Sequence, residues 1–371
     1  MDTMRRLGGV WPTTELGKKL CSVQELETPS TIHNILKKHL SLPWHRNLKI
    51  RLKDIEKAQG IIYGLAIGDC LGQPTERIKL NEIKRRFGSK GIKELPDPAI
   101  FTDDTQLSIA VAEALINSKS FNKNIFMKAI KKEFIRWLHS PENARGPGKS
   151  CMQGIQNMEN GISWDKSSIK DAMGCGSAMR VAPIGYVLQY NPIKMQEFAH
   201  ISGICTHNHE SANAACIGMT WLIKFALDNI PPSEYIQRLL IITDGMSIEF
   251  TRSIDKVRQC LLWEDEEKAL KYIGEGWVGH EAVALALYCF LRYPNSYKKT
   301  VLRGANSDGD SDSIASIAGA ISGAYLGVNS IPKDWIKSVE KTEYLRELAI
   351  RLEIRKIEYI KNKNLLPPLC F

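Results

Sequence analysis

Apolar residues recur at intervals of three and four over most of the chain beyond residue 50, which is the pattern of buried or amphipathic α-helices. The pattern begins at Arg51, in the segment RLKDIEKAQGIIYGLAIGDCLG. Runs of alternating β-branched residues, which would indicate strands, are nearly absent. We therefore predict an all-α fold, with further helices at residues 103–117, 123–139, 192–204, 210–227, 232–245, 247–262, 280–292, 312–327 and 334–361.

Glycines occupy every fourth position, 60, 64, 68 and 72, of the first predicted helix. Residues four apart lie on one face of a helix, so this stripe brings a neighbouring helix close and normally serves tight packing. A second predicted helix carries small residues at positions 315, 319, 323 and 327. We expect both helices to be packed unusually closely.

The chain is predicted to form one domain preceded by an extension. Residues 1–50 lack sustained periodicity and hold only a short amphipathic run, Ser30 to Leu40, between two prolines. No repeat of fixed period and no low-complexity linker follows. We assign residues 1–50 to an N-terminal extension and residues 51–365 to a single compact orthogonal helical bundle.

The amino-acid composition constrains the class of protein and its compartment but does not indicate a reaction. The 371 residues are 43% hydrophobic and 25% charged, as in ordinary globular proteins, and no segment approaches the roughly 18 apolar residues of a membrane span. The basic N-terminus lacks the apolar core of a secretory signal, so we expect a cytoplasmic protein that does not enter membranes. Several of the nine cysteines, such as Cys216 and Cys289, fall in apolar helical stretches, where a thiol acts as a small buried hydrophobe.

The net charge of +9 is compatible with a nucleic acid, an anionic ligand or simply a basic surface. The basic residues are dispersed, and their densest runs are interleaved with acidic or apolar residues. Solvated helix faces therefore explain them better than a nucleic-acid groove does. We expect no stable nucleic-acid complex, whereas a pyrophosphate ligand fits the charge.

Three segments resemble known ligand-binding motifs but lack residues that those motifs require. In RGPGKS, residues 145–150, the first glycine of a phosphate-binding P-loop would fall on Asn143, and a helix rather than a strand precedes it. MGCGSAM has Met179 where a dinucleotide-binding fingerprint needs its third glycine. His207 and His209 are two residues apart and would point to different helix faces, unlike a zinc-protease pair, so zinc is disfavoured.

Two clusters of acids and hydroxyls stand at the starts of predicted helices. N-capping and the helix dipole account for one or two of these oxygens, but not for all of them. Brought together without a cation, the clusters would repel; magnesium, manganese and calcium prefer such oxygen ligands, whereas zinc and copper prefer imidazole and thiolate. On residue types alone, a hard-cation site and ordinary capping both stay open. The residues concerned are Thr102, Asp103, Asp104 and Thr105 in the first cluster and Asp308, Asp310, Asp312 and Ser313 in the second.

Two more carboxylates lie in the segment GLAIGDCLGQPTE. Asp69 falls on the glycine-striped helix, where a buried, hydrogen-bonded acid would be a sufficient role. Glu76 follows a turn that contains Pro74, beyond the helix end, and is better placed to reach a ligand.

In its motifs the chain resembles the ADP-ribosylglycohydrolase family, which includes the dinitrogenase reductase activating glycohydrolase. The matching segments span residues 56–327 and occur in the family's order, a combination far more specific than any one of them. The first fifty residues fall outside the resemblance. The segments are GLAIGDCLGQPTE, FTDDTQLS, NARGPG, GCGSAMRVAPIG, THNHESANAA, GWVGHEAVALALYCF and NSDGDSDSIASIAGAISGA.

This resemblance implies a compact all-α fold with a site for two divalent cations, Mg²⁺ or Mn²⁺. Ser313 stands where many members have threonine, so the hydroxyl is retained. Asp308 stands where glycine is common, so this loop carries an extra negative charge. The metal ligands implied by the matching motifs are Thr102, Asp103, Asp104, Asp310, Asp312 and Ser313.

The resemblance also implies a substrate site. Glu76 matches the family's active-site glutamate, and His207 matches a Thr-His motif near the ligand, although a lone histidine is more often structural. The RGPG turn, with Gly146 and Gly148, would flank the phosphates or serve simply as a tight turn. The loop that resembles the lining of the ADP-ribose site, with backbone N–H groups available to phosphate oxygens, contributes Gly176, Ser177, Met179 and Arg180.

The predicted function is metal-dependent hydrolysis of the glycosidic bond between ADP-ribose and an acceptor on a protein or small molecule. Water would attack the anomeric carbon, with Glu76 or Asp310 as general base. The acceptor, such as arginine or serine, and the choice between the two bases stay open. Alternatives are a catalytically silent ADP-ribose-binding relative and a two-metal nucleotide pyrophosphohydrolase. A monomer suffices for this fold.

Overall fold

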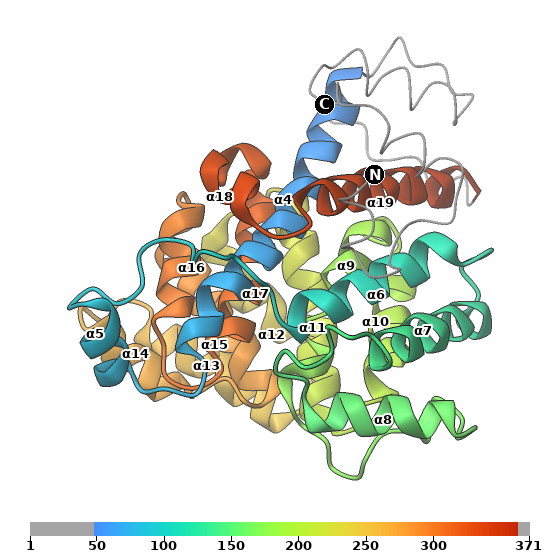
Figure 1. Ribbon diagram of the computed structural model, residues 1–371, viewed down its shortest axis with the longest axis horizontal. Coiled ribbons are helices and arrows are strands. Elements are labelled where there is room, and N and C mark those ends of the chain that lie inside the picture. Colours follow the sequence, from blue (N-terminus) through green and yellow to red (C-terminus); the bar gives the residue numbers. More distant parts are fainter. Residues whose placement is uncertain (1–47, 363–371) are drawn as a thin grey trace.

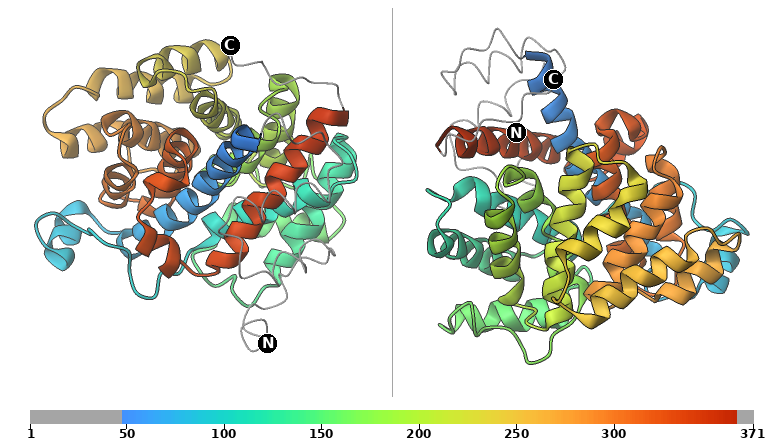
Figure 2. Two further views of the ribbon diagram at one scale, coloured as in Figure 1. Left: turned by 90° about the horizontal axis from the view of Figure 1, so that it is seen from above. Right: turned by 180° about the vertical axis from the view of Figure 1, so that it is seen from behind.

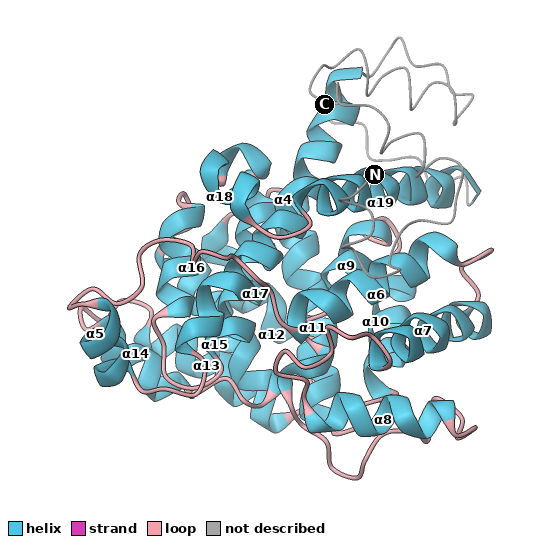
Figure 3. Cartoon of the chain, in the orientation of Figure 1, coloured by secondary structure: helices cyan, strands magenta, loops and turns pink. Residues whose placement is uncertain are grey.

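The computed structural model describes residues 48–362, and the statements below refer to this part of the chain. It consists of helices joined by loops and turns (Figure 3), and β-structure is limited to three isolated bridges that pair Ala99 with Val339, Ile169 with His207 and Gly174 with Val278. The all-α prediction is therefore confirmed. The amphipathic run predicted at residues 30–40 lies outside the described residues.

Most of the predicted helices are present. Helices α6 (Asp103–Asn117), α10 (Pro192–Ile204) and α11 (Glu210–Leu227) begin and end at the predicted residues. The predicted helix at 232–245 is a short 3₁₀ turn, η4 (Pro232–Glu234), followed by α12 (Tyr235–Ile242). Ends differ by one or two residues in α7 (Lys123–Leu138), α13 (Ile248–Cys260), α15 (Gly279–Arg292) and α17 (Ser311–Leu326).

The single helix predicted at residues 334–361 is wrong, because the chain breaks it into α18 (Lys333–Ser338) and α19 (Thr342–Asn362). Between them Lys341 has a left-handed backbone, with φ at 55°. The break is stabilised by tertiary hydrogen bonds. The Glu340 N–H donates to Ala99 O at 3.0 Å, and the Glu340 carboxylate accepts from the Phe101 N–H at 2.9 Å. These bonds replace the helical ladder there.

Five short helices were not predicted. They have six to eleven residues and adjoin the turn-rich segments, so the sequence offers too few periods to recognise. One of them, α9, is buried all round and has no polar face to reveal its period. The five are α5 (Leu80–Phe87), α8 (Lys149–Glu159), α9 (Ala182–Val187), α14 (Glu266–Ile273) and α16 (Tyr297–Ala305).

The glycine-striped helix α4 (Leu48–Gly72) packs antiparallel against α17 at backbone contact (Figures 1 and 2). A Cβ atom added to Gly64 would lie 2.3 Å from the carbonyl oxygen of Gly319, and one added to Gly319 would lie 2.1 Å from that of Gly64. The expectation of close packing is confirmed. The same relationship pairs Gly60 with Gly323, Gly68 with Ala315 and Gly72 with Ser311. As a result, the end of α4 is held beside the beginning of α17.

A continuous cluster of buried apolar side chains extends from Ala58 to Tyr359. Helix α19 lies along α4 and α6 (Figure 1), where the Arg351 guanidinium binds both oxygens of Glu113 at 2.6 and 2.8 Å. The Tyr344 hydroxyl adds a third bond to Glu113 at 2.8 Å. None of the described helices has the length and apolar character needed to cross a bilayer.

Candidate active site

One cavity of about 210 Å³ lies where several chain segments far apart in the sequence converge. Its wall includes the first residues of α6, α8 and α17, so three helix N-termini open on the same space. Helix N-termini carry partial positive charge and unpaired N–H groups, which favour an anionic ligand. The rest of the wall includes the turn after α4, the RGPG turn, the 3₁₀ turn η3 (Cys175–Ser177), Met179, His207 and Trp277.

Most of the residues singled out from the sequence line this cavity. Both acid clusters, the RGPG turn and the glycine-rich loop contribute residues to it, although Asp104 and Asp310 are more than 200 positions apart in the sequence. The lining includes Glu76, Asp103, Asp104, Gly146, Gly148, Gly176, Met179, His207, Asp310, Asp312 and Ser313. Three of the predicted residues lie behind the wall instead: Thr102, Ser177 and Arg180.

In the first cluster, capping accounts for one residue only. Thr102 is the N-cap of α6: its hydroxyl oxygen accepts from the Asp104 N–H at 3.4 Å and its hydroxyl proton is donated to Asp69 at 2.9 Å. Asp103 instead accepts from the Gly148 N–H at 3.3 Å and so holds the RGPG turn. Oxygen Oδ1 of Asp104 is buried and has no hydrogen-bond partner within the described chain. The cap thus leaves two carboxylates available.

The second cluster has a similar surplus of oxygen ligands. Asp310 occupies the N-cap position of α17 but makes no capping bond, and its Oδ2 accepts from the Cys175 thiol at 2.9 Å. Asp312 accepts from the Ser313 N–H at 3.0 Å. Asp308 is turned away, because its carboxylate accepts from the Leu80 N–H at 2.6 Å where α5 begins. The extra charge in this loop therefore stabilises a neighbouring helix and stays outside the cavity lining.

In this arrangement the buried carboxylates cannot all be ionised without desolvation cost and mutual repulsion. Burial, reinforced by the charges of Asp69 and Asp310, raises the pKa of Asp103 to about 8. Burial and neighbouring carboxylates also raise the pKa values of Asp104 and Asp312 well above their ordinary value. Burial likewise raises the pKa of Asp310. Positive charge placed among these groups would relieve the repulsion.

These properties fit a site for hard divalent cations. The donors are carboxylate and hydroxyl oxygens, which Mg²⁺ and Mn²⁺ prefer, and the unpartnered Oδ1 of Asp104 is a ready ligand. Among residues 48–362, no three His, Cys, Asp or Glu side chains are already gathered tightly enough to enclose an ion. Closing on a cation would therefore need side-chain rotation. The two-cation centre stays a proposal.

The RGPG turn covers the acids. Gly146 has a left-handed backbone, with φ at 75°, and a Cβ atom added there would lie 3.6 Å from Asp103 Oδ1 and 3.8 Å from Glu76 Oε2. The conformation favours glycine, and the absence of a side chain leaves the space above both carboxylates open. Gly148 leads directly into α8 as its N-cap.

Arg180 organises the wall from behind. Its guanidinium is fully buried and donates to Gly176 O at 2.8 Å, Ser202 O at 2.7 Å and Thr206 Oγ1 at 2.8 Å. It is therefore occupied by protein acceptors and acts as a positioning residue for η3. Ser177 is also buried, with its hydroxyl 3.5 Å from Ala212 O.

His207 faces the cavity as a neutral imidazole. Its Nδ1 lies 2.8 Å from Thr206 Oγ1, and burial together with the Arg180 charge lowers its pKa to about 3. The ring also packs against the glycine-rich loop: a Cβ atom added to Gly176 would lie 2.8 Å from its Cε1. A larger residue at Gly176 would push the histidine aside.

Several lining residues were not singled out from the sequence. Arg77 donates to Glu76 Oε1 at 2.8 Å, and its guanidinium lies 6.0 Å from the centre of the Trp277 ring, which is 39% exposed. Arg77 directly follows Glu76, and Trp277 lies in the segment GWVGHEAVALALYCF, so the motifs already recognised were the available signal. The others are Lys149, Ser150, Cys151 and Cys175.

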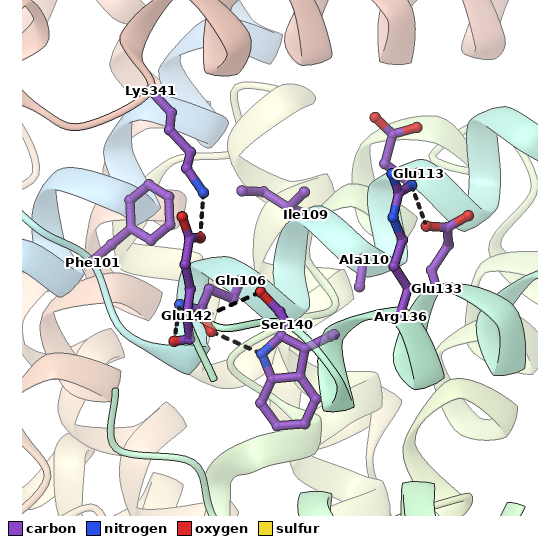
Figure 4. A pocket seen from close by; sticks show the side chains of 11 residues that line it. Phe101, Gln106, Ile109, Ala110, Glu113, Glu133, Arg136, Ser140, Glu142 and Lys341 are labelled. Carbon is purple, nitrogen blue, oxygen red and sulfur yellow. Dashed lines mark hydrogen bonds and ion pairs between the residues drawn. The ribbon is translucent and has the colours of Figure 1, made fainter. Parts of the chain in front are cut away.

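Two other cavities contain none of the predicted site residues. A small one of about 50 Å³, between α6, α7 and Lys341, has polar walls that are paired with one another (Figure 4): Lys341 with Glu142, and Arg136 with Glu133. A shallower groove of about 580 Å³ runs between α5 and α16. Neither one collects the unpaired carboxylates that distinguish the first cavity.

The described chain is an all-α bundle in which two acidic helix starts and two glycine-rich turns line one cavity. The chain belongs to the ADP-ribosylglycohydrolase family, whose model matches residues 51–359. This confirms the family and the enzyme class predicted from the motifs.

Individual relatives agree. ADP-ribosylhydrolase ARH3 of Mus musculus is 26% identical over 348 residues, covering 80% of this chain and 91% of its own. The ADP-ribosyl-[dinitrogen reductase] glycohydrolase of Rhodospirillum rubrum is 26% identical over 312 residues, covering 81% and 94%. A solved ADP-ribosylglycohydrolase-related protein complex matches with a TM-score of 0.64 at 21% identity, over 82% of this chain and 99% of that one, and shows the shared fold.

Proposed function

We propose that this protein hydrolyses the glycosidic bond between ADP-ribose and a modified acceptor, such as an arginine or serine side chain, with the help of two divalent cations, Mg²⁺ or Mn²⁺. One observation carries the proposal: two acid clusters from distant helices line a single cavity together with two glycine-rich turns. Relatives named as ADP-ribosylhydrolases support the same reaction class.

The cavity walls offer complementary contacts for such a ligand. The N-terminus of α8, with Lys149 beside it, presents backbone N–H groups and positive charge suited to a pyrophosphate. The carboxylates of both clusters would hold the cations, which when bound orient the ribose hydroxyls and lower the pKa of a coordinated water. The proposed cation ligands remain Thr102, Asp103, Asp104, Asp310, Asp312 and Ser313; the Thr102 hydroxyl would have to exchange its bond to Asp69 to take part.

Glu76 is the better candidate for the general base. It lies beyond the helix end, with its side chain 16% exposed, so it can meet a water molecule. Asp310 is engaged by the Cys175 thiol and buried among other acids. Glu76 would accept a proton as the water oxygen bonds to the anomeric carbon and the acceptor departs with the electrons of the broken bond. The surrounding carboxylates would stabilise the positive charge that develops on the ribose.

Product analysis tests this proposal directly. The purified protein is incubated with arginine-linked and serine-linked ADP-ribosyl peptides, with Mg²⁺, with Mn²⁺ and with a chelator, and the products are identified by mass spectrometry. We expect release of intact ADP-ribose only when a cation is present, and the peptide that reacts identifies the acceptor. AMP and ribose phosphate would instead show a pyrophosphohydrolase. Bound ADP-ribose without turnover of either peptide would show a binding protein.

A further inference from the structure

Cys175 places a thiol among the carboxylate and hydroxyl oxygens of the two acid clusters. Its Sγ lies 2.9 Å from Asp310 Oδ2 and 3.4 Å from Ser313 Oγ, two of the proposed cation ligands. The backbone around it is well held: the Cys175 N–H donates to Trp277 O at 3.3 Å, and its carbonyl accepts from the Ala178 N–H at 2.8 Å. The thiol is therefore directed at the carboxylates by the main chain.

A second, independent observation at the same place is a buried carboxylate oxygen without a partner. Asp104 is 97% buried, since only 3% of its surface is exposed, and its Oδ1 has no hydrogen-bond partner in the described chain although the residue lines the cavity. Such an orphaned carboxylate oxygen is costly unless something positive binds it. Asp104 and Cys175 are thus lining residues of the same cavity.

We propose that Cys175 becomes a sulfur ligand when a thiophilic divalent cation, Cd²⁺, Zn²⁺ or Co²⁺, is captured by the carboxylates of this cavity. The inference rests on the proposed cation centre and goes beyond it, because it gives that centre a second mode of binding. A sulfur–metal bond forms, the thiol proton passes to solvent, and no oxidation state changes. Soft cations select thiolate, whereas Mg²⁺ and Mn²⁺ select oxygen and leave the thiol protonated.

The structure provides a matched control in Cys151. It lines the same cavity, but its Sγ lies 3.5 Å from Nη1 of Arg180, a cation, and close to Gly176, and among the described residues it makes no hydrogen bond to a proposed ligand. Cys151→Ser therefore removes one thiol from the same wall without touching the acid clusters. Cys175→Ser and Cys175→Ala remove the proposed sulfur ligand.

The test is a titration of the full chain with Cd²⁺ and with Co²⁺, followed by the sulfur-to-metal charge-transfer absorption. We expect the band in the parent protein and in Cys151→Ser, its loss in both Cys175 variants, and a Cd²⁺ affinity about 10- to 100-fold weaker in those variants. Added Mn²⁺ should diminish the parent's band by competition. Mn²⁺ binding, read by electron paramagnetic resonance, should persist in all of the variants.

The outcomes distinguish failure of the proposed cation centre from failure of Cys175 as its sulfur ligand. If no protein binds Mn²⁺ or Cd²⁺, the cation centre itself is wrong. If the parent binds Cd²⁺ in competition with Mn²⁺ but shows no charge-transfer band, Cys175 is not a ligand, whatever the variants do. A band of equal strength in folded Cys175→Ser, checked by circular dichroism, would also overturn the inference by assigning the sulfur to another cysteine.

Discussion

The carboxylate of Asp69 accepts both donors of Thr102, the backbone N–H at 3.0 Å and the hydroxyl at 2.9 Å. It accepts the same pair from Thr105, at 3.0 and 2.6 Å. A helix residue that lies outside the cavity lining thus fixes the first turn of α6, which carries Asp103 and Asp104.

Replacing this acceptor should disturb the site without removing any proposed ligand. In Asp69→Asn, the amide nitrogen would face donors, so we expect a loss of about 1–3 kcal/mol in unfolding free energy, measured by urea denaturation, and weaker Mn²⁺ binding. Thr105→Val, which removes one bond only, is the matched control and should cost less. Equal stability of Asp69→Asn and the parent would show that the four bonds do not constrain α6.

Backbone contact between α4 and α17 should make their glycines intolerant of any side chain. Gly64→Ala and Gly319→Ala each place a methyl group against a carbonyl oxygen, so we expect losses of about 3 kcal/mol or more in thermal or urea unfolding. Gly148→Ala is the control: its φ is −65° and nothing lies within 4 Å of the added carbon. Because Gly148 is the N-cap of α8, where alanine is less favourable than glycine, it should cost about 1 kcal/mol or less.

Acid should weaken the protein through His207. Because its folded pKa, about 3, is below the ordinary 6.5, the unfolded chain binds the proton more readily between these values. Stability is therefore present above pH 6.5 and is lost as pH falls toward 3, by about 2 kcal/mol between pH 7 and pH 5. The difference in unfolding free energy between these two pH values should shrink by that amount in His207→Asn. If the difference in unfolding free energy is the same in His207→Asn and in the parent, a group other than His207 takes up the proton.

Measurements of kcat and of Mn²⁺ affinity should distinguish the general base, Glu76, from a cation ligand, Asp310. Glu76→Gln should lower kcat by about 10²- to 10⁴-fold while Mn²⁺ binding persists. Asp310→Asn should lower both Mn²⁺ affinity and kcat. Turnover and Mn²⁺ titration of the two variants side by side decide the assignment: if Glu76→Gln loses activity only in proportion to bound Mn²⁺, Glu76 is not the base.

Trp277 should report ligand binding, because its half-exposed ring is part of the cavity wall. We expect ADP-ribose to change tryptophan fluorescence in the parent but not in Trp277→Phe. Trp277→Ala should weaken ADP-ribose binding by about 1 kcal/mol, roughly fivefold in Kd. Trp263→Phe is the control, since that ring packs on Tyr272 and is not part of the lining. If ADP-ribose changes the fluorescence of Trp277→Phe as much as that of the parent, the Trp277 ring is not part of the binding site.

The sequence was most informative where periodicity and small residues coincide. The stripe at Gly60, Gly64, Gly68 and Gly72 predicted close helix packing, and the partner stripe on α17 satisfies it. Long helices such as α11 were recognisable over several turns, whereas short helices such as α9 were not. The break at Lys341 depends on hydrogen bonds to Ala99 and Phe101, which lie some 240 residues earlier and leave no local signal.

The order of the motifs predicted which residues come together at the cavity, but not which of their polar atoms already have hydrogen-bond partners in the protein. Arg180 was expected at the ligand, yet both Nη atoms of its guanidinium donate to backbone and hydroxyl acceptors behind the wall. Asp308 looked like one more acid of the cluster, but it binds the start of α5. The Cys175 thiol was overlooked because its importance comes from the position of Asp310, 135 residues away.

The backbone contact of α4 with α17 also determines where the molecule can move. Helices in which glycines of one lie against carbonyl oxygens of the other at four successive levels cannot slide past each other by part of a turn without collision. The separation between Glu76 and the start of α17 is thus a property of the main chain and is insensitive to side-chain rotation elsewhere. Adjustment to a ligand must therefore come from side chains and from turns such as the one at Gly146, and not from sliding of α4 against α17.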